Sequence, residues 1–323
     1  MDSSTETKKS PFTPNLTEVL SSIPCVPDLS HKRNLASHRK LFEWTPEQAF
    51  TDPQISHVEK RIPGPDGDIA LTILRKKGPR STSRPGIYFL HGGGLVMGTR
   101  YTFLQAVFEW VKQIDAVVIS AEYRLAPEHP SPAGFEDAYV GFQWTADHAA
   151  ELDINPKKLL IAGASAGGGL AAAVALKARD DKGLEPCGQL LLYPMLDDRC
   201  ATKSMEQFST DGTWTGVASK AAWDLVLPGR RGSDKVNVYE APGRAIDLSG
   251  LPPTFIEVAS TEPFRDECVN YASNLCINGV ETELHLWPGI FHSSEVFAPD
   301  AYQSQGAFAT RLAWVKELLL ERD

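Results

Sequence analysis

The chain has 323 residues and a formal net charge of −9, and 42% of its residues are hydrophobic. This length and composition are those of a globular protein with a large core, and the acidic balance argues against nucleic acid as a partner, because phosphates need a basic face. No apolar stretch reaches the roughly 18 residues that a membrane-spanning helix needs, so no membrane span is expected.

The first residues, 1–11, are polar and lack the apolar run of a signal peptide. The five cysteines show no C-x-x-C spacing, so neither a zinc site nor a disulfide framework is indicated. We therefore expect a cytoplasmic protein without a metal site. A homodimer formed by pairing of edge strands is left open.

The pattern of apolar residues predicts alternating strands and helices. Two helices are expected first, at 14–22 and 28–43, and then a hairpin over 55–62 and 68–76 with its turn at 63–67. Further strands are expected at 86–90, 116–120, 159–162, 190–193, 254–258 and 282–286, and helices at 101–113, 135–152, 170–177, 265–278 and 301–320. This alternation predicts an α/β fold with a mostly parallel sheet of about eight strands, flanked by helices on both faces.

One segment, residues 198–250, interrupts the alternation. About fifty residues without a strand pattern are too many for a plain loop inside an α/β fold. We interpret the segment as an inserted helical cap. Residues 1–50 would supply further cap helices, which leaves 51–323 as the main domain that carries the insertion.

A candidate nucleophile lies in Gly163-Ala-Ser165-Ala-Gly167, which matches G-x-S-x-G between a predicted strand and a predicted helix. Such a turn lifts the serine hydroxyl off the sheet, beside backbone N–H groups that can stabilise negative charge. Gly163, Gly167 and Gly169 also fit a dinucleotide-binding pattern of short-chain dehydrogenases. That motif normally opens a chain, and no tyrosine here has a lysine four residues later, but the short pattern alone leaves both interpretations open.

A second glycine-rich stretch, His91-Gly92-Gly93-Gly94, directly follows a predicted buried strand. Glycines there allow backbone N–H groups to turn into a cavity, as an oxyanion hole requires. A lone glycine triplet is usually a simple turn, but this one precedes the serine motif in the order that a hydrolase needs. Gly92, Gly93, Gly94 and Ala166 are the predicted oxyanion donors.

Four motifs now stand in order: HGGG at 91–94, YRLAPEHPSPA at 123–133, GASAGG at 163–168 and YPMLDDR at 193–199. Together they resemble the hormone-sensitive-lipase-like family of α/β-hydrolases, and the similarity covers roughly residues 50–320. The resemblance implies the α/β-hydrolase fold with a helical cap, serine carboxylesterase activity and no cofactor.

The other members of a catalytic triad follow from chain order, which in this fold is serine, acid, histidine. His292 comes just after the last predicted strand and can reach Ser165 as a general base. Members of the family resemble D-P-L-R-D-E after the preceding strand, and this chain has Glu262 where they have the first Asp. A glutamate can still hold the histidine in the right tautomer. Asp266 is the alternative acid.

These residues predict a serine hydrolase that cleaves short acyl esters, acetyl esters of larger alcohols among them, through an acyl-enzyme. A lactonase or an acyltransferase with the same triad stays open. A small-molecule receptor is a further alternative, but gibberellin receptors resemble the family without its catalytic histidine, and His292 is present here. Formamidases of this type carry a tryptophan close after His-Gly-Gly, where this chain has Leu95. Leu95 and Trp214 are the expected substrate-pocket residues.

Overall fold

The computed structural model describes residues 8–322 except 24, 27 and 80. Within this part of the chain one eight-stranded sheet has the order β1-β2-β4-β3-β5-β6-β7-β8. Pairs β1–β2 and β2–β4 are antiparallel, and the remaining pairs are parallel. The strands are β1 (Ile55–Gly64), β2 (Gly67–Lys76), β3 (Arg84–Leu90), β4 (Val117–Ala121), β5 (Ile154–Ala164), β6 (Gln189–Leu192), β7 (Thr254–Ala259) and β8 (Thr282–Trp287). The predicted α/β-hydrolase architecture is confirmed.

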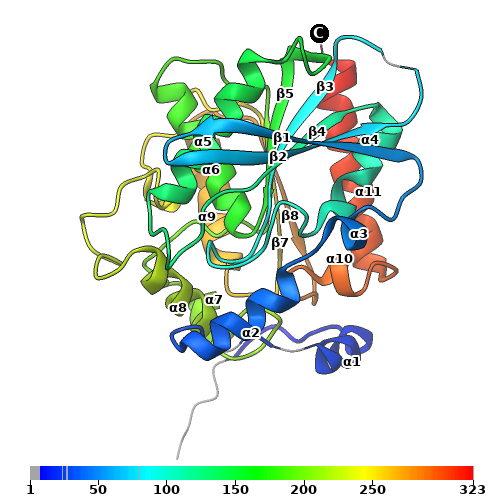
Figure 1. Ribbon diagram of the computed structural model, residues 1–323. Helices are drawn as coiled ribbons and strands as arrows, with labels where there is room; N and C mark the ends of the chain where they lie inside the picture. Colours follow the sequence, from blue (N-terminus) through cyan, green and yellow to red (C-terminus); the bar gives the residue numbers. More distant parts are fainter. Residues whose placement is uncertain (1–7, 24, 27, 80, 323) are drawn as a thin grey trace, which may run out of the picture.

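Helices cover both faces of this sheet. In Figure 1, α5, α6 and α9 lie on one side of the strands, and α4 and α11 lie on the other. The helices of the two layers are α4 (Phe108–Ile114), α5 (Ala133–Asp147), α6 (Ala166–Asp180), α9 (Arg265–Ile277) and α11 (Tyr302–Lys316), which continues as the π-helical turn η3 (Glu317–Glu321). β3, β4, β6 and β7 are buried along their whole length because both of their faces are covered. None of the helices in the described residues is long and apolar enough to cross a bilayer.

Several predicted boundaries need correction: α5 ends at Asp147 rather than 152, β5 already begins at Ile154, and three further differences have a local cause. The helix expected at 101–113 starts later, as η1 (Leu104–Val107) followed by α4, because Phe103 has a left-handed φ of 63° that breaks the first turn. The helix expected at 28–43 starts at Lys32 (α2, Lys32–Phe42), since the Asp28 side chain accepts a hydrogen bond from Ser30 N in a local turn. The hairpin turn is shorter than predicted, because the two strands stay paired as far as Gly64 and Gly67.

The remaining helices gather at one end of the molecule. Residues 193–253, all of them described, contain no strand, and they carry α7 (Lys203–Gln207), α8 (Gly216–Val226) and the short η2 (Pro242–Arg244). Figure 1 shows α7 and α8 beside α1 (Pro14–Ser22) and α2, below the carboxyl ends of the parallel strands. Val26 N donates to Thr213 O at 3.1 Å, so the N-terminal segment and the insertion are joined directly. The remaining short helices are α3 (Pro46–Ala49) and α10 (Ser294–Phe297).

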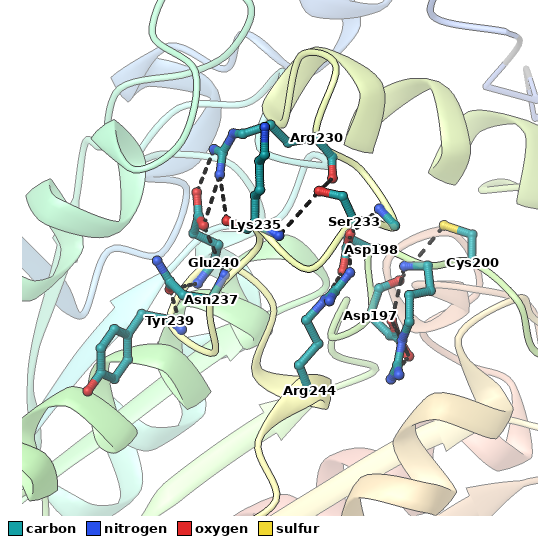
Figure 2. A network of polar contacts seen from close by, with 12 residues as sticks. Asp197, Asp198, Cys200, Arg230, Ser233, Lys235, Asn237, Tyr239, Glu240 and Arg244 are labelled. Atoms are coloured by element: carbon teal, nitrogen blue, oxygen red, sulfur yellow. Dashed lines mark hydrogen bonds and ion pairs between the residues drawn. The ribbon is translucent and has the colours of Figure 1, made fainter.

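Two ion pairs join residues within the insertion (Figure 2), and a hydrogen bond connects it to the main domain. Asp198 is fully buried, and Arg244 Nε donates to its Oδ1 at 2.6 Å. Glu240 accepts from Arg230 Nη2 at 2.7 Å and from Ser131 Oγ, on the loop before α5, at 3.0 Å. The ion pairs stabilise the folded insertion, and the Ser131 hydrogen bond connects it to the loop before α5.

Candidate active site

Ser165 occupies a sharp turn between β5 and α6. Its backbone has φ 56° and ψ −119°, a sparsely populated conformation that typically costs about 1–3 kcal/mol. The flanking glycines make this turn possible: a Cβ on Gly163 would lie 2.1 Å from Gly167 O, and a Cβ on Gly167 would lie 2.1 Å from Leu90 O. The turn therefore presents the serine at the carboxyl edge of the sheet, as the G-x-S-x-G pattern predicted.

Two side chains from later loops meet this serine. His292 Nε2 lies 3.0 Å from Ser165 Oγ, and His292 Nδ1 lies 3.1 Å from Glu262 Oε2. The loops that follow β7 and β8 deliver Glu262 and His292 to the same edge as the end of β5. All three side chains are almost fully buried. Burial raises the pKa of the Glu262 carboxyl, and the nearby His292 ring works against that rise.

Asp266, the alternative acid, is bound elsewhere. Its Oδ2 accepts from Ser204 N at 2.7 Å, and its Oδ1 accepts from Arg265 Nε at 2.7 Å. It lies in the first turn of α9, where a carboxylate interacts favourably with the helix dipole. This carboxylate links α9 to α7 in the cap, and the acid next to His292 is Glu262.

The glycine loop after β3 lies against the serine turn. A Cβ on Gly92 would come within 3.3 Å of Ser165 Cβ, and Gly93 and Gly94 have positive φ values of 123° and 64°. Within the described chain, the N–H groups of Gly93 and Gly94 donate no hydrogen bond. Ala166 is the first residue of α6, where backbone N–H groups have no intrahelical acceptor. These unpaired donors beside Ser165 are what an oxyanion hole consists of.

A cavity of about 40 Å³, here called the catalytic cavity, opens in front of Ser165 and His292. Its apolar lining comes from both parts of the molecule: the N-terminal and cap segments supply Ile23, Val26, Phe42 and Trp214, and the main domain supplies Met97, Phe103 and Phe297. Among the described residues that line it, none is Asp, Glu, Lys or Arg. An outer cavity of about 220 Å³ shares four of these apolar residues, and Ser165 is not in its lining. A mostly apolar cleft with a few convergent polar groups is the usual form of a small-molecule site.

Trp214 and Leu95, the two predicted pocket residues, lie in different places. Trp214 lines the catalytic cavity, and a Cβ on Gly94 would lie 2.4 Å from its Cη2 atom, so the indole covers the glycine loop. Leu95 lines a separate cavity of about 20 Å³ together with Phe135 and Tyr239. Leu95 is not among the described residues that line the catalytic cavity, since with φ at 61° the chain turns away from Ser165 at this residue, and its role in a substrate pocket stays a prediction.

Sequence reasoning missed two residues that touch His292. Thr213 Oγ1 donates to His292 O at 2.6 Å, and the Tyr193 ring meets the imidazole at 4.7 Å between centroids. Tyr193 opens the YPMLDDR motif, so a signal was present. Thr213 is 79 residues from its partner, inside a segment without a recognisable pattern, and only the folded cap reveals it.

Comparisons with known proteins agree with this geometry. A family model described as alpha/beta hydrolase fold matches residues 87–295. Esterase LipI of Mycobacterium tuberculosis is 34% identical over 290 residues, which cover 89% of each chain. Carboxylesterase NlhH of the same species is 36% identical over 273 residues, 80% of this chain and 84% of that protein. Among solved structures, Bacterial Heroin Esterase superposes with a TM-score of 0.89 at 32% identity and covers 97% of this chain and 98% of its own.

These matches extend over most of the chain, and all of them are to α/β-hydrolases or esterases. The chain therefore belongs to the α/β-hydrolase fold family. Within that family it is a hormone-sensitive-lipase-like carboxylesterase, as the four motifs predicted. The protein is a carboxylic ester hydrolase, and its substrates are small esters.

Proposed function

We propose that the enzyme hydrolyses esters of short acyl groups, acetyl esters included, with Ser165 as nucleophile, His292 as general base and Glu262 as the acid that orients it. The observation that carries this proposal is the unbroken relay from Ser165 Oγ to His292 at 3.0 Å and from His292 to Glu262 at 3.1 Å. Such a relay is the arrangement that activates a serine hydroxyl.

In the first half-reaction, Ser165 Oγ attacks the ester carbonyl carbon while His292 Nε2 takes the hydroxyl proton. The N–H groups of Gly93, Gly94 and Ala166 bind the resulting oxyanion, with Gly92 shaping the loop. The intermediate then collapses: the ester C–O bond breaks, and the alcohol leaves with the proton that His292 held. A water molecule, deprotonated by His292, cleaves the acyl-enzyme and releases the acid and free Ser165.

The preference for short acyl groups is proposed from the shape of the two cavities. Trp214 covers the glycine loop beside Ser165, so space for an acyl chain is restricted on that side. The outer cavity is larger and apolar, with Leu41, Phe42 and Trp44 in its lining, and offers room for a bulky apolar alcohol. The aromatic side chains of this cavity would bury the alcohol group of the ester. That burial would contribute about 25 cal/mol to the binding free energy per Å² of apolar surface removed from water.

The decisive experiment is Ser165→Ala with p-nitrophenyl acetate as the substrate. We expect kcat to fall by at least about a thousandfold, because the oxyanion donors alone give only residual catalysis. Ser249→Ala, on an exposed turn, is the matched control and keeps wild-type kcat. Equal thermal unfolding midpoints for both variants would assign the loss to chemistry. Retained turnover by Ser165→Ala would refute the proposal.

Three further statements about the molecule are proposals from the sequence. The division into cap segments at 1–50 and 198–250 and a main domain over 51–323 is one, and limited proteolysis tests it. A homodimer that pairs edge strands is the second, and light scattering on the purified protein tests it. A cytoplasmic location is the third, and cell fractionation tests it.

A further inference from the structure

Behind the proposed triad lies a cluster of buried charges that the mechanism does not use. Glu257 on β7, Glu295 on α10 and Arg311 on α11 are each at most 4% exposed. Arg311 Nε donates to Glu257 Oε1 at 2.6 Å, and Arg311 Nη2 donates to Glu295 Oε1 at 2.8 Å. Charges this deeply buried persist only when they are paired, so one guanidinium holds two carboxylates from separate elements together.

This cluster is joined to the catalytic histidine by a tyrosine. Tyr193 Oη donates to Glu295 Oε1 at 2.8 Å, and the Tyr193 ring meets the His292 ring edge-on, at 4.7 Å and 70°. Glu295 follows His292 by three residues, in the short helix that begins directly after it. Arg311 and Tyr193 thus fix Glu295, and Glu295 fixes the end of the loop that carries His292.

The cluster and the catalytic acid face the same enclosed space. A small rear cavity of about 10 Å³ is lined by Glu262, Glu295, Arg311 and Tyr193, among others. Glu262 Oε1 and Arg311 Nη1 are buried and, within the described residues, have no hydrogen-bond partner. Because water is largely excluded here, the effective dielectric constant is low and charges interact strongly across the space.

We propose that Glu295, held by Arg311 and Tyr193, is a positioning residue that also stabilises the protonated form of His292 during catalysis. This inference rests on the triad proposed above. An ionised carboxylate near an imidazole favours the imidazolium, which must form each time Ser165 loses its proton. The titratable or charged groups that face this region from the surrounding elements are Tyr193, Glu257, Glu262, Glu267, Cys268, His292, Glu295 and Arg311.

The ionisation state of Glu295 supports the proposal. Burial alone would raise the pKa of its carboxyl, but the charge of Arg311 and the hydrogen bond from Tyr193 outweigh burial and hold that pKa below its usual range. Glu295 is therefore negatively charged at neutral pH. Neutralising it removes negative charge from the rear of His292 and makes the imidazolium less stable.

The test is the pH profile of kcat/KM for Glu295→Gln with a neutral ester. The glutamine keeps an oxygen that accepts from Tyr193 and loses only the charge. On the low-pH side of the profile, the acid limb, kcat/KM falls because His292 becomes protonated in the free enzyme. Without the negative charge at position 295, we expect this limb to move to lower pH by about half a pH unit or more. Glu281→Gln, which removes an exposed carboxylate paired with Arg322, is the matched control and leaves the limb in place.

A second variant tests positioning without a change in charge. Tyr193→Phe keeps the ring against His292 and deletes the hydrogen bond to Glu295, so we expect kcat to fall about tenfold while KM and the thermal midpoint change little. An unshifted acid limb in folded Glu295→Gln overturns the electrostatic role. Wild-type kcat in Tyr193→Phe overturns the positioning role, and this variant decides alone if Glu295→Gln does not fold. If one of these two contradicting results appeared while Ser165→Ala still lost its activity, the proposed nucleophile would be supported and only the role of Glu295 would be refuted.

Discussion

The two sides of His292 differ in chemical character. In front, the catalytic cavity has aromatic and aliphatic walls and, among its described lining residues, neither a carboxylate nor a lysine or arginine. Behind, the rear cavity faces three glutamates and one arginine, all nearly fully buried. The charges that organise the imidazole are thus kept apart from the space where a substrate would bind. The front can select neutral apolar esters while the back fixes the protonation and orientation of the base.

The two sides also differ in which parts of the chain build them. The N-terminal segment and the cap supply part of the front walls, with residues such as Ile23, Phe42 and Trp214, beside main-domain residues such as Met97 and Phe103. The rear groups sit on β7, α10 and α11 of the main domain. Substitutions in front should therefore change which ester is cleaved, and substitutions behind should change how fast any ester is cleaved.

The largest effect is expected behind His292, at the orienting acid. Glu262→Gln should lower kcat by roughly a hundredfold to ten-thousandfold, because an amide in place of the carboxylate favours the wrong histidine tautomer and leaves the imidazolium without its countercharge. Steady-state kinetics with p-nitrophenyl acetate measures the loss.

Asp266→Asn is the matched control for this prediction, because Asp266 is the alternative acid and lies four residues after Glu262. Its partners are Ser204 and Arg265, so we expect less than about a tenfold fall in kcat, with some loss of thermal stability. If Asp266→Asn proved the more damaging of the two, the acid would have to be reassigned.

A smaller effect, measurable on the unmodified enzyme, tests the uncharged front. Methyl butyrate and monomethyl succinate present similar acyl chains, but the second ends in a carboxylate. Burying that carboxylate without a partner costs several kcal/mol, so we expect kcat/KM to be about a hundredfold or more lower for the succinate ester at pH 7.5. Similar values for the two esters would mean that the cavity stays open to solvent during turnover.

Much of this site could be predicted from the sequence because its backbone requirements are local. Gly163 is needed by a close approach to Gly167 two residues after Ser165, and the glycine loop follows its strand directly, whereas Gly167 is needed by its approach to Leu90 at the end of β3. Chain order then places Glu262 and His292 at the ends of the last two strands. Helix starts near Phe103 and Lys32 were missed because single turn conformations, rather than periodic patterns, decide them.

What could not be predicted depends on contacts between distant segments. Leu95 is adjacent in sequence to the oxyanion loop, yet a left-handed turn directs the chain into another cavity. Thr213 and Arg311 reach the region of His292 only through the folded cap and the last long helix. An isolated arginine in a helix gives no sign in the sequence that it will be buried between two glutamates.

The smallest effect is expected in front, where Trp214 covers the glycine loop. Trp214→Ala should change kcat for acetyl esters by no more than a few-fold. It should raise the ratio of octanoyl to acetyl kcat/KM by about tenfold, because removing the indole opens room for a longer acyl chain. Each additional contact in an apolar pocket is worth about 1–3 kcal/mol. Leu95→Ala, which enlarges the neighbouring cavity, is the control and should leave the chain-length profile unchanged. Profiles from C2 to C12 esters measure both. A shift caused by Leu95→Ala but not by Trp214→Ala would reverse the assignment of the two residues and would place the acyl chain on the other side of the glycine loop.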